Sequence, residues 1–88
     1  MRYTVKPSRK AEKELNHLDR ESLRRIQTRI DELAQDPFDP RLSHQLEMSP
    51  EQRYSRVGDW RIIFEVDVPD EIMNVAAIQH RSRVYKKL

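Results

Sequence analysis

Arginine and tyrosine side chains are concentrated in two separate segments of the chain. The segment QRYSRVGDWRIIFEV, residues 52–66, carries three arginines among aromatic and β-branched residues, and HRSRVYKKL, residues 80–88, carries four basic residues and one tyrosine. A guanidinium group donates two parallel hydrogen bonds to phosphate oxygens and keeps its charge at any physiological pH. Aromatic side chains among the basic ones suit RNA, because unstacked bases need a flat partner. We therefore expect these segments to bind phosphate.

Side chains alternate between the two faces of a strand, which indicates where each arginine points. In the strand predicted over residues 60–67, Arg61 and Glu65 fall on the face opposite an apolar row. That row consists of Trp60, Ile62, Phe64 and Val66. We expect it to pack under helices, which leaves Arg61 on the open face. The alternative is a solvated strand face on which Glu65 pairs with an arginine, an interaction that contributes only about 0–1 kcal/mol.

The same rule orients the preceding strand, predicted over residues 53–57. Tyr54 and Arg56 share a face that can coincide with the face of Arg61, whereas Arg53 has the opposite parity and is expected at a rim. The open face of the sheet is therefore predicted to collect two arginines and one tyrosine from this hairpin.

The C-terminal segment supplies the remaining candidates. Arg81 and Tyr85 follow the last predicted strand and can close the same concavity. RNA contacts are expected from further residues of both segments, namely Arg53, Tyr54, Arg83, Lys86 and Lys87. The alternative interpretation of the tail is a frayed basic C-terminus.

The N-terminal half reads as a strand and two helices. Residues 2–7 alternate and stop at Pro7, and Ser8 can cap a helix from Arg9 to Leu18. Asp19 can cap a second helix with one apolar stripe, formed by Leu23, Ile26, Ile30, Leu33 and Ala34. These two segments predict an antiparallel helical hairpin.

The C-terminal half reads as a loop followed by three strands. Residues 35–52 contain three prolines and little periodicity, which predicts a loop. Gly58-Asp59 joins the first two strands as a tight turn, residues 72–79 form an apolar last strand, and a helical turn can follow from Ser82. We predict an α+β domain in which the helical hairpin packs on one face of an antiparallel sheet.

Composition sets outer bounds on the protein. Its 88 residues suffice for one domain, residues 1–88. Charged residues make up 36% of the chain but the net charge is only +2, so charge alone does not indicate nucleic-acid binding. With no cysteine and no apolar stretch of membrane-spanning length, we expect a soluble cytoplasmic protein without disulfides or membrane contact.

In order along the chain, these motifs resemble the RelE/ParE superfamily, the toxins of prokaryotic toxin–antitoxin pairs. The resemblance rests on Arg56-Val57-Gly58-Asp59-Trp60-Arg61, on His80-Arg81 followed by Tyr85, and on the opening strand and helical hairpin. It spans nearly the whole chain. It implies a small α+β toxin domain, held inactive by a cognate antitoxin protein.

The resemblance implies two alternative activities. RelE-like members bind the ribosomal A site and cut messenger RNA there, whereas ParE-like members share the fold, lack the RNase residues and poison DNA gyrase. The RelE-like reading makes the chain an endoribonuclease that inhibits translation, with the ribosome and mRNA as partners. Its active-site set would be Arg56, Arg61, Arg81 and Tyr85. RelE-like enzymes often carry lysines in the strand before the hairpin, and this chain has none there, which leaves the general base open.

His80 is a further acid–base candidate, because histidine is the side chain that titrates near neutral pH. Its parity is opposite to that of Arg81, and the alternative is that its ring caps the end of the strand. His17 and His44 lack carboxylate or thiol neighbours at ligand spacing, so no metal or other cofactor is expected. A third possibility for the whole chain is a non-catalytic module that only binds its antitoxin or RNA.

Overall fold

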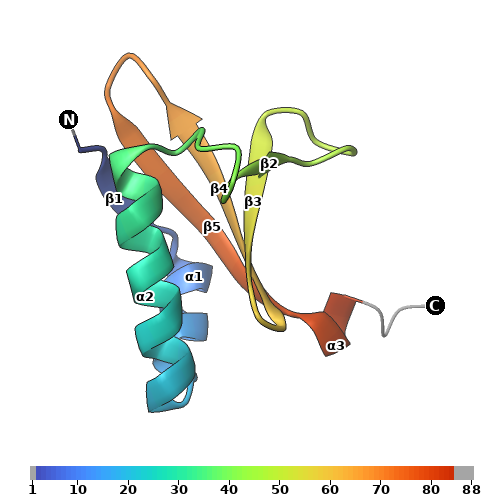
Figure 1. Cartoon of the computed structure of the whole chain (residues 1–88). Coiled ribbons are helices and arrows are strands. Elements are labelled where there is room, and N and C mark those ends of the chain that lie inside the picture. The colour runs from blue at the N-terminus through green and yellow to red at the C-terminus, as the bar shows by residue number, and fades with distance from the viewer. Residues whose placement is uncertain (1, 85–88) are drawn as a thin grey trace.

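Two helices cover one face of a five-stranded sheet in the computed structural model (Figure 1), which describes residues 2–84. The elements in chain order are β1 (Thr4–Pro7), α1 (Arg9–Asn16), α2 (Arg20–Gln35), β2 (His44–Gln45), β3 (Gln52–Val57), β4 (Trp60–Asp67), β5 (Ile72–His80) and α3 (Arg81–Val84). The predicted α+β architecture, with its helical hairpin and short C-terminal helical turn, is confirmed.

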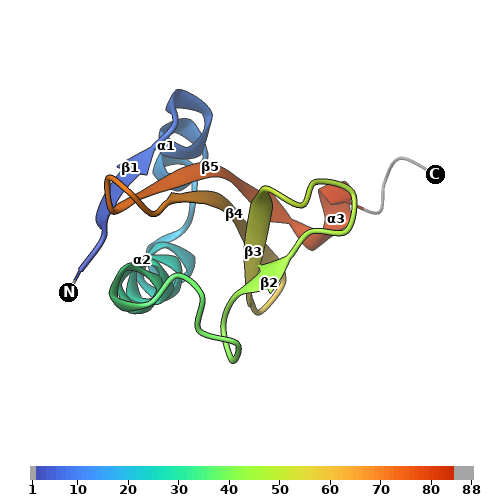
Figure 2. The ribbon, with the colours of Figure 1, turned by 90° about the horizontal axis from the view of Figure 1, so that it is seen from above.

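The strand order of the sheet is β1-β5-β4-β3-β2, so that β1 and β2 form its two edges (Figure 2). β3, β4 and β5 make the predicted antiparallel meander, and β1 adds to β5 in parallel. The meander places the start of α3 beside the β3–β4 turn, because β5 runs back along β4 until His80 lies opposite Trp60. Two segments that are distant in the sequence thus meet at one end of the sheet.

Both main helices begin where their capping residues predict. The Ser8 hydroxyl accepts a hydrogen bond from the Ala11 backbone amide over 3.0 Å, and the Asp19 carboxylate accepts one from the Ser22 amide over 3.1 Å. The hydrogen bonds from Ser22 hold the pKa of Asp19 below its ordinary value. α1 ends at Asn16, two residues before the predicted end.

The core lies between the helices and the sheet. The helices contribute Ala11, Ile26, Ile30 and Leu33, and the sheet contributes Val57, Ile62, Phe64, Met73, Val75 and Ile78. Trp60 and Val66 are half-buried and pack against the same cluster. The predicted apolar row of β4 is therefore confirmed to face the helices, and this orientation sends Arg61 to the other face.

The fold differs from the sequence-based prediction between α2 and β3. Residues His44–Gln45 form strand β2, which pairs with Tyr54 and Arg53 of β3, so the loop prediction is wrong there. A two-residue strand is too short to show an alternation of polar and apolar residues in the sequence. It is defined only by its backbone pairing with β3. On the open face Ile63 is 5% exposed, so this face is not uniformly solvated. In the described part of the chain, no helix is long and apolar enough to cross a membrane.

Candidate functional site

A cavity of about 180 Å³ opens beside the β3–β4 turn, on the face of the sheet away from the two main helices. We call this space the arginine cavity. The residues that line it are Tyr54, Arg56, Gly58, Asp59, Trp60, Arg61 and Arg81. The structure thus brings together three guanidinium groups and one tyrosine that the sequence carries in two separate segments.

The β3–β4 hairpin positions two of these arginines. Val57 pairs with Trp60 around a two-residue turn, so Arg56 and Arg61 lie directly opposite each other one step further along the ladder. Gly58 adopts φ +59°, the left-handed region that a tight two-residue hairpin needs and that glycine enters without strain.

Arg61 is held in place by contacts on two sides. Its Nη2 donates to Oε1 of Gln79 on β5 over 3.1 Å, and its guanidinium carbon lies 5.6 Å from the centre of the Tyr54 ring. Its Nε is buried and has no hydrogen-bond partner among the described residues. Leaving a buried donor unpaired costs about 1–3 kcal/mol, more for a charged group, so an anion that reached this donor would relieve that cost.

Arg81 is positioned beside the cavity by a backbone hydrogen bond. Its amide donates to the Asp59 carbonyl over 2.7 Å, which ties the first residue of α3 to the β3–β4 turn. Because the turn also carries the cross-strand pair of Arg56 and Arg61, this bond sets the position of α3 relative to both arginines.

Two polar residues of this site were not expected from the sequence. Gln79 lies opposite Arg61 in the β4–β5 register and orients its guanidinium group. Asp59 adds a carboxylate to the cavity lining. Strand parity could have found Gln79, since it shares the open face with Arg61. Nothing in the local pattern distinguishes the Asp59 side chain from an ordinary turn residue.

Arg53 lies outside the arginine cavity and contacts the loop before β2. Its Nε donates to the Ser43 hydroxyl over 2.6 Å, and its guanidinium carbon lies 5.0 Å from the centre of the Phe38 ring. Its parity, opposite to that of Arg56, gives it this different environment. Tyr54 packs on the other side of the same strand against His44, with ring centres 5.3 Å apart.

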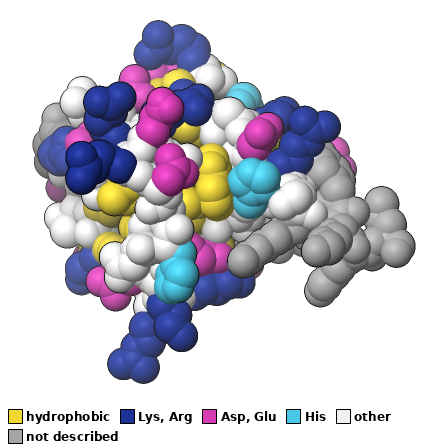
Figure 3. Space-filling view, turned by 90° about the horizontal axis from the view of Figure 1, so that it is seen from below, with side chains coloured by type: hydrophobic (Ala, Val, Ile, Leu, Met, Phe, Trp, Pro, Cys, Tyr) yellow, Lys and Arg dark blue, Asp and Glu magenta, His cyan; other side chains and the backbone are white. Residues whose placement is uncertain are grey.

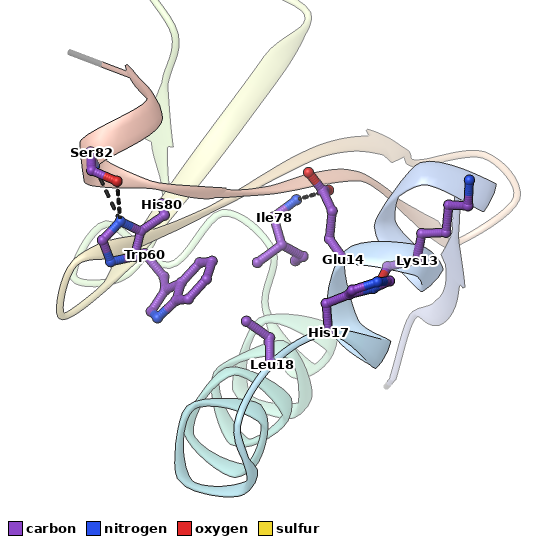
Figure 4. Close-up of a pocket in the computed structure, with 8 residues that line it drawn as sticks. All are labelled: Lys13, Glu14, His17, Leu18, Trp60, Ile78, His80 and Ser82. Atoms are coloured by element: carbon purple, nitrogen blue, oxygen red, sulfur yellow. Dashed lines mark hydrogen bonds between the residues drawn. The ribbon is translucent and has the colours of Figure 1, made fainter. Parts of the chain in front are cut away.

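His80 lines a different, larger cavity of about 450 Å³ between α1, the ends of β4 and β5, and the start of α3 (Figure 4). Its ring meets the Trp60 ring edge-on at 4.7 Å between centres, and its Nδ1 accepts a hydrogen bond from the Ser82 amide over 3.2 Å. Figure 3 views the molecule from this end and shows hydrophobic side chains with histidines beside them. His80 thus caps α3 and does not line the arginine cavity.

The remaining predicted site residues lie at the C-terminus. Tyr85, Lys86 and Lys87 are outside the described residues, as is the side chain of Arg83. Within residues 2–84, no three histidine, aspartate or glutamate side chains are grouped so that they could hold a metal ion.

The family comparison bears directly on this arrangement. A family model described as the ParE toxin of the type II toxin–antitoxin system, parDE, matches residues 5–85. The chain belongs to the ParE toxin family. This match includes the hairpin, the first turn of α3 and Tyr85, and it confirms the predicted RelE/ParE superfamily.

Several solved structures similar to this ParE-family chain come from toxin–antitoxin systems. A chain of the RelBE2 complex of Mycobacterium tuberculosis is 21% identical, with a TM-score of 0.81 over 93% of this chain and 94% of that one. A chain of the archaeal RelE–RelB complex of Pyrococcus horikoshii OT3 is 26% identical, with a TM-score of 0.79 over 94% and 99%.

The isolated Escherichia coli RelE toxin is 18% identical to this ParE-family chain, with a TM-score of 0.79 over 97% of this chain and 93% of that one. No curated protein sequence matches the chain. The family model therefore carries the name ParE, while the three similar structures given above are of RelE proteins or of RelBE complexes.

Proposed function

We propose that this ParE-family toxin is an endoribonuclease that cuts messenger RNA in the ribosomal A site and so inhibits translation in the cytoplasm. The observation that supports the proposal is the arginine cavity, in which Arg56, Arg61 and Arg81 surround one space beside Tyr54. Three guanidinium groups suit a phosphodiester, and Tyr54 offers a ring for stacking on a base.

The proposed reaction is attack of a ribose 2′-oxygen on the adjacent phosphorus. The 2′-hydroxyl gives its proton to a base, the bond from phosphorus to the 5′-oxygen breaks, and an acid protonates that oxygen. The products are a 2′,3′-cyclic phosphate and a free 5′-hydroxyl. Negative charge increases on the non-bridging oxygens as the 2′-oxygen adds, so the transition state needs donors at the phosphate.

Arg61 and Arg81 suit the role of these donors. Arg61 is oriented by Gln79 and retains an unpaired, buried Nε, and Arg81 is placed by the bond from its amide to Asp59. Preorganised donors of this kind contribute about 3–4 kcal/mol each to transition-state stabilisation. Arg56, exposed on the same face, would hold the RNA backbone.

Proton transfer is assigned to Tyr85 on the basis of the family resemblance. Arginine is a very poor acid or base at physiological pH. His80 lines the cavity of about 450 Å³, and its Nδ1 already accepts a hydrogen bond from the Ser82 amide. Its proposed role is therefore to position α3 and not to exchange protons with RNA.

A cognate antitoxin is the proposed protein partner. The solved complexes similar to this chain pair RelE with RelB proteins. An acidic antitoxin would complement the basic open face of the sheet and prevent RNA from entering the arginine cavity.

The test is in vitro translation followed by primer extension on the message. We expect codon-positioned cuts with the wild-type toxin, and their loss in Arg61→Gln, Arg81→Gln and Tyr85→Phe proteins. Arg9→Gln, which removes an exposed charge on α1, should still cut. An intact message with wild-type toxin would overturn the proposal.

The name of the matching family model favours a second candidate, inhibition of DNA gyrase. In that case wild-type toxin would trap gyrase–DNA complexes and leave the message uncut. The same set of arginine variants, assayed with purified gyrase and supercoiled DNA, separates the two candidates.

A further inference from the structure

A second basic concavity lies on the α2 side of the β3–β4 turn. It has a volume of about 310 Å³, and its lining residues are Arg24, Arg25, Thr28, Arg29, Glu32, Arg56, Val57 and Gly58. Four guanidinium groups thus border this space together with one carboxylate. The sequence pattern places Arg24, Arg25 and Arg29 only on the polar faces of a helix. The tertiary structure brings these faces beside the β3–β4 hairpin.

The single carboxylate is already neutralised within this concavity. Arg29 donates from Nε to Glu32 over 3.2 Å, and from Nη1 to the Ser55 hydroxyl over 2.9 Å and to the Arg56 carbonyl over 2.7 Å. Arg29 therefore anchors α2 to β3 and pairs with Glu32. The excess positive charge of the concavity remains with the other three arginines.

The side chains of Arg24 and Arg25 are available to contact a ligand. Both are exposed, and neither side chain makes a hydrogen bond or ion pair with the described residues. The guanidinium of Arg25 lies over the turn, where a Cβ built on Gly58 would be 3.1 Å from its Nη2. The absence of a side chain at residue 58 thus lets the Arg25 guanidinium approach the turn closely.

The second concavity borders the arginine cavity. Arg56 and Gly58 line both spaces, one on each side of the turn. A linear polyanion seated between Arg61 and Arg81 would pass Arg56 and cross Gly58 to meet Arg25 and Arg24. Among residues 2–84, those that line the second concavity include no aromatic residue, so they offer contacts to phosphates and no stacking surface for bases.

We propose that Arg24 and Arg25 extend the arginine cavity into a track that binds the backbone phosphates of single-stranded RNA beyond the scissile bond. This inference rests on the proposed function, in that RNA is the ligand. Phosphate contacts add binding affinity without distinguishing one base sequence from another. They also fix the position of the nucleic-acid strand on the protein surface. A longer RNA should therefore bind more tightly than a fragment that fills only the arginine cavity.

The test measures the salt dependence of binding for two labelled RNAs, a uridine trinucleotide and a uridine dodecamer, by fluorescence anisotropy. Each phosphate contact on single-stranded nucleic acid contributes about 0.7 to the slope of log affinity against log salt. Arg24→Gln/Arg25→Gln should lower the dodecamer slope by about 1.4 and leave the trinucleotide slope unchanged. Between about 50 and 200 mM salt this is a difference of roughly sevenfold in affinity loss.

Three controls make the outcomes distinct. Arg24→Lys/Arg25→Lys retains both charges and should keep the wild-type slope, and Arg9→Gln/Lys10→Gln removes two exposed charges from α1 and should also keep it. Arg61→Gln should weaken both RNAs. An unchanged dodecamer slope in Arg24→Gln/Arg25→Gln, or an equal fall in the α1 variant, would overturn the track alone. Wild-type protein that binds neither RNA would overturn the track and count against RNA as the substrate.

Discussion

Arg56 on β3 and Arg61 on β4 lie directly opposite each other in the antiparallel ladder. Gln79 continues this row on β5, where it accepts a hydrogen bond from Arg61, and no carboxylate interrupts the row. Like charges that face each other across strands destabilise a sheet. A pair of this kind, at the cavity that Arg81 also lines, supports our proposal that these positions bind an anionic ligand.

We expect Arg56→Thr to stabilise the folded protein by about 0.2–1 kcal/mol, because it removes the cross-strand repulsion and places a residue with high strand propensity there. Urea unfolding followed by the fluorescence of Trp60 measures the effect. Lys6→Thr is the matched control, since Lys6 faces Asn74 and no like charge. A loss of stability in Arg56→Thr would contradict the repulsion argument.

Arg61→Lys should fail to restore cleavage. Lysine keeps the charge but loses the planar fork that bonds Gln79 and a phosphate at the same time. We expect a fall in kcat of about 10²–10³, close to that of Arg61→Gln, as removal of an oriented transition-state donor causes. Single-turnover cleavage assays measure it. Near wild-type activity in Arg61→Lys would show that charge alone suffices.

Substitutions of His80 should separate capping from proton transfer. Asparagine at this position can accept the Ser82 amide as Nδ1 of the histidine does, whereas alanine cannot. We therefore expect His80→Asn to retain most cleavage activity and His80→Ala to lose several-fold, measured side by side in the translation assay. Equal losses in the two variants would instead indicate that the imidazole itself takes part in the reaction.

The Asp19 cap should make stability depend on pH on the acidic side. Because the Ser22 hydrogen bonds lower the pKa of Asp19 in the folded state, the stabilisation is present above its unfolded pKa and is lost as the pH falls through the folded pKa. We expect wild-type protein to melt at a higher temperature than Asp19→Ala at pH 6, and the gap to shrink at pH 2.5. Thermal melts followed by circular dichroism measure it; a gap of constant size would contradict this cause.

Gly58→Ala should destabilise the hairpin by about 1–3 kcal/mol, because a residue with a Cβ is strained at φ +59°. Gly58→Asn should cost less, since asparagine tolerates the left-handed region. The 3.1 Å approach to Arg25 adds little to either variant, because the end of that side chain can move. Urea midpoints for the two variants decide this. An equal cost would assign the effect to crowding instead of backbone conformation.

Local features of the sequence determined the elements of this protein and the facing of its main strand. Ser8 and Asp19 cap the helices because their side chains bond amides three residues away, an interaction that depends on the adjacent sequence alone. The alternation along β4 put Ile62 and Phe64 under the helices and Arg61 on the open face.

Only the tertiary structure decided how distant segments meet at the site. The β4–β5 register pairs Arg61 with Gln79, and the bond from the Arg81 amide to the Asp59 carbonyl attaches α3 to the turn. Strand β2 forms only by pairing with β3, and the Arg25 side chain lies over Gly58 only because α2 packs beside the hairpin. Local periodicity carries no information on these pairings, because they result from how the whole chain packs its single core.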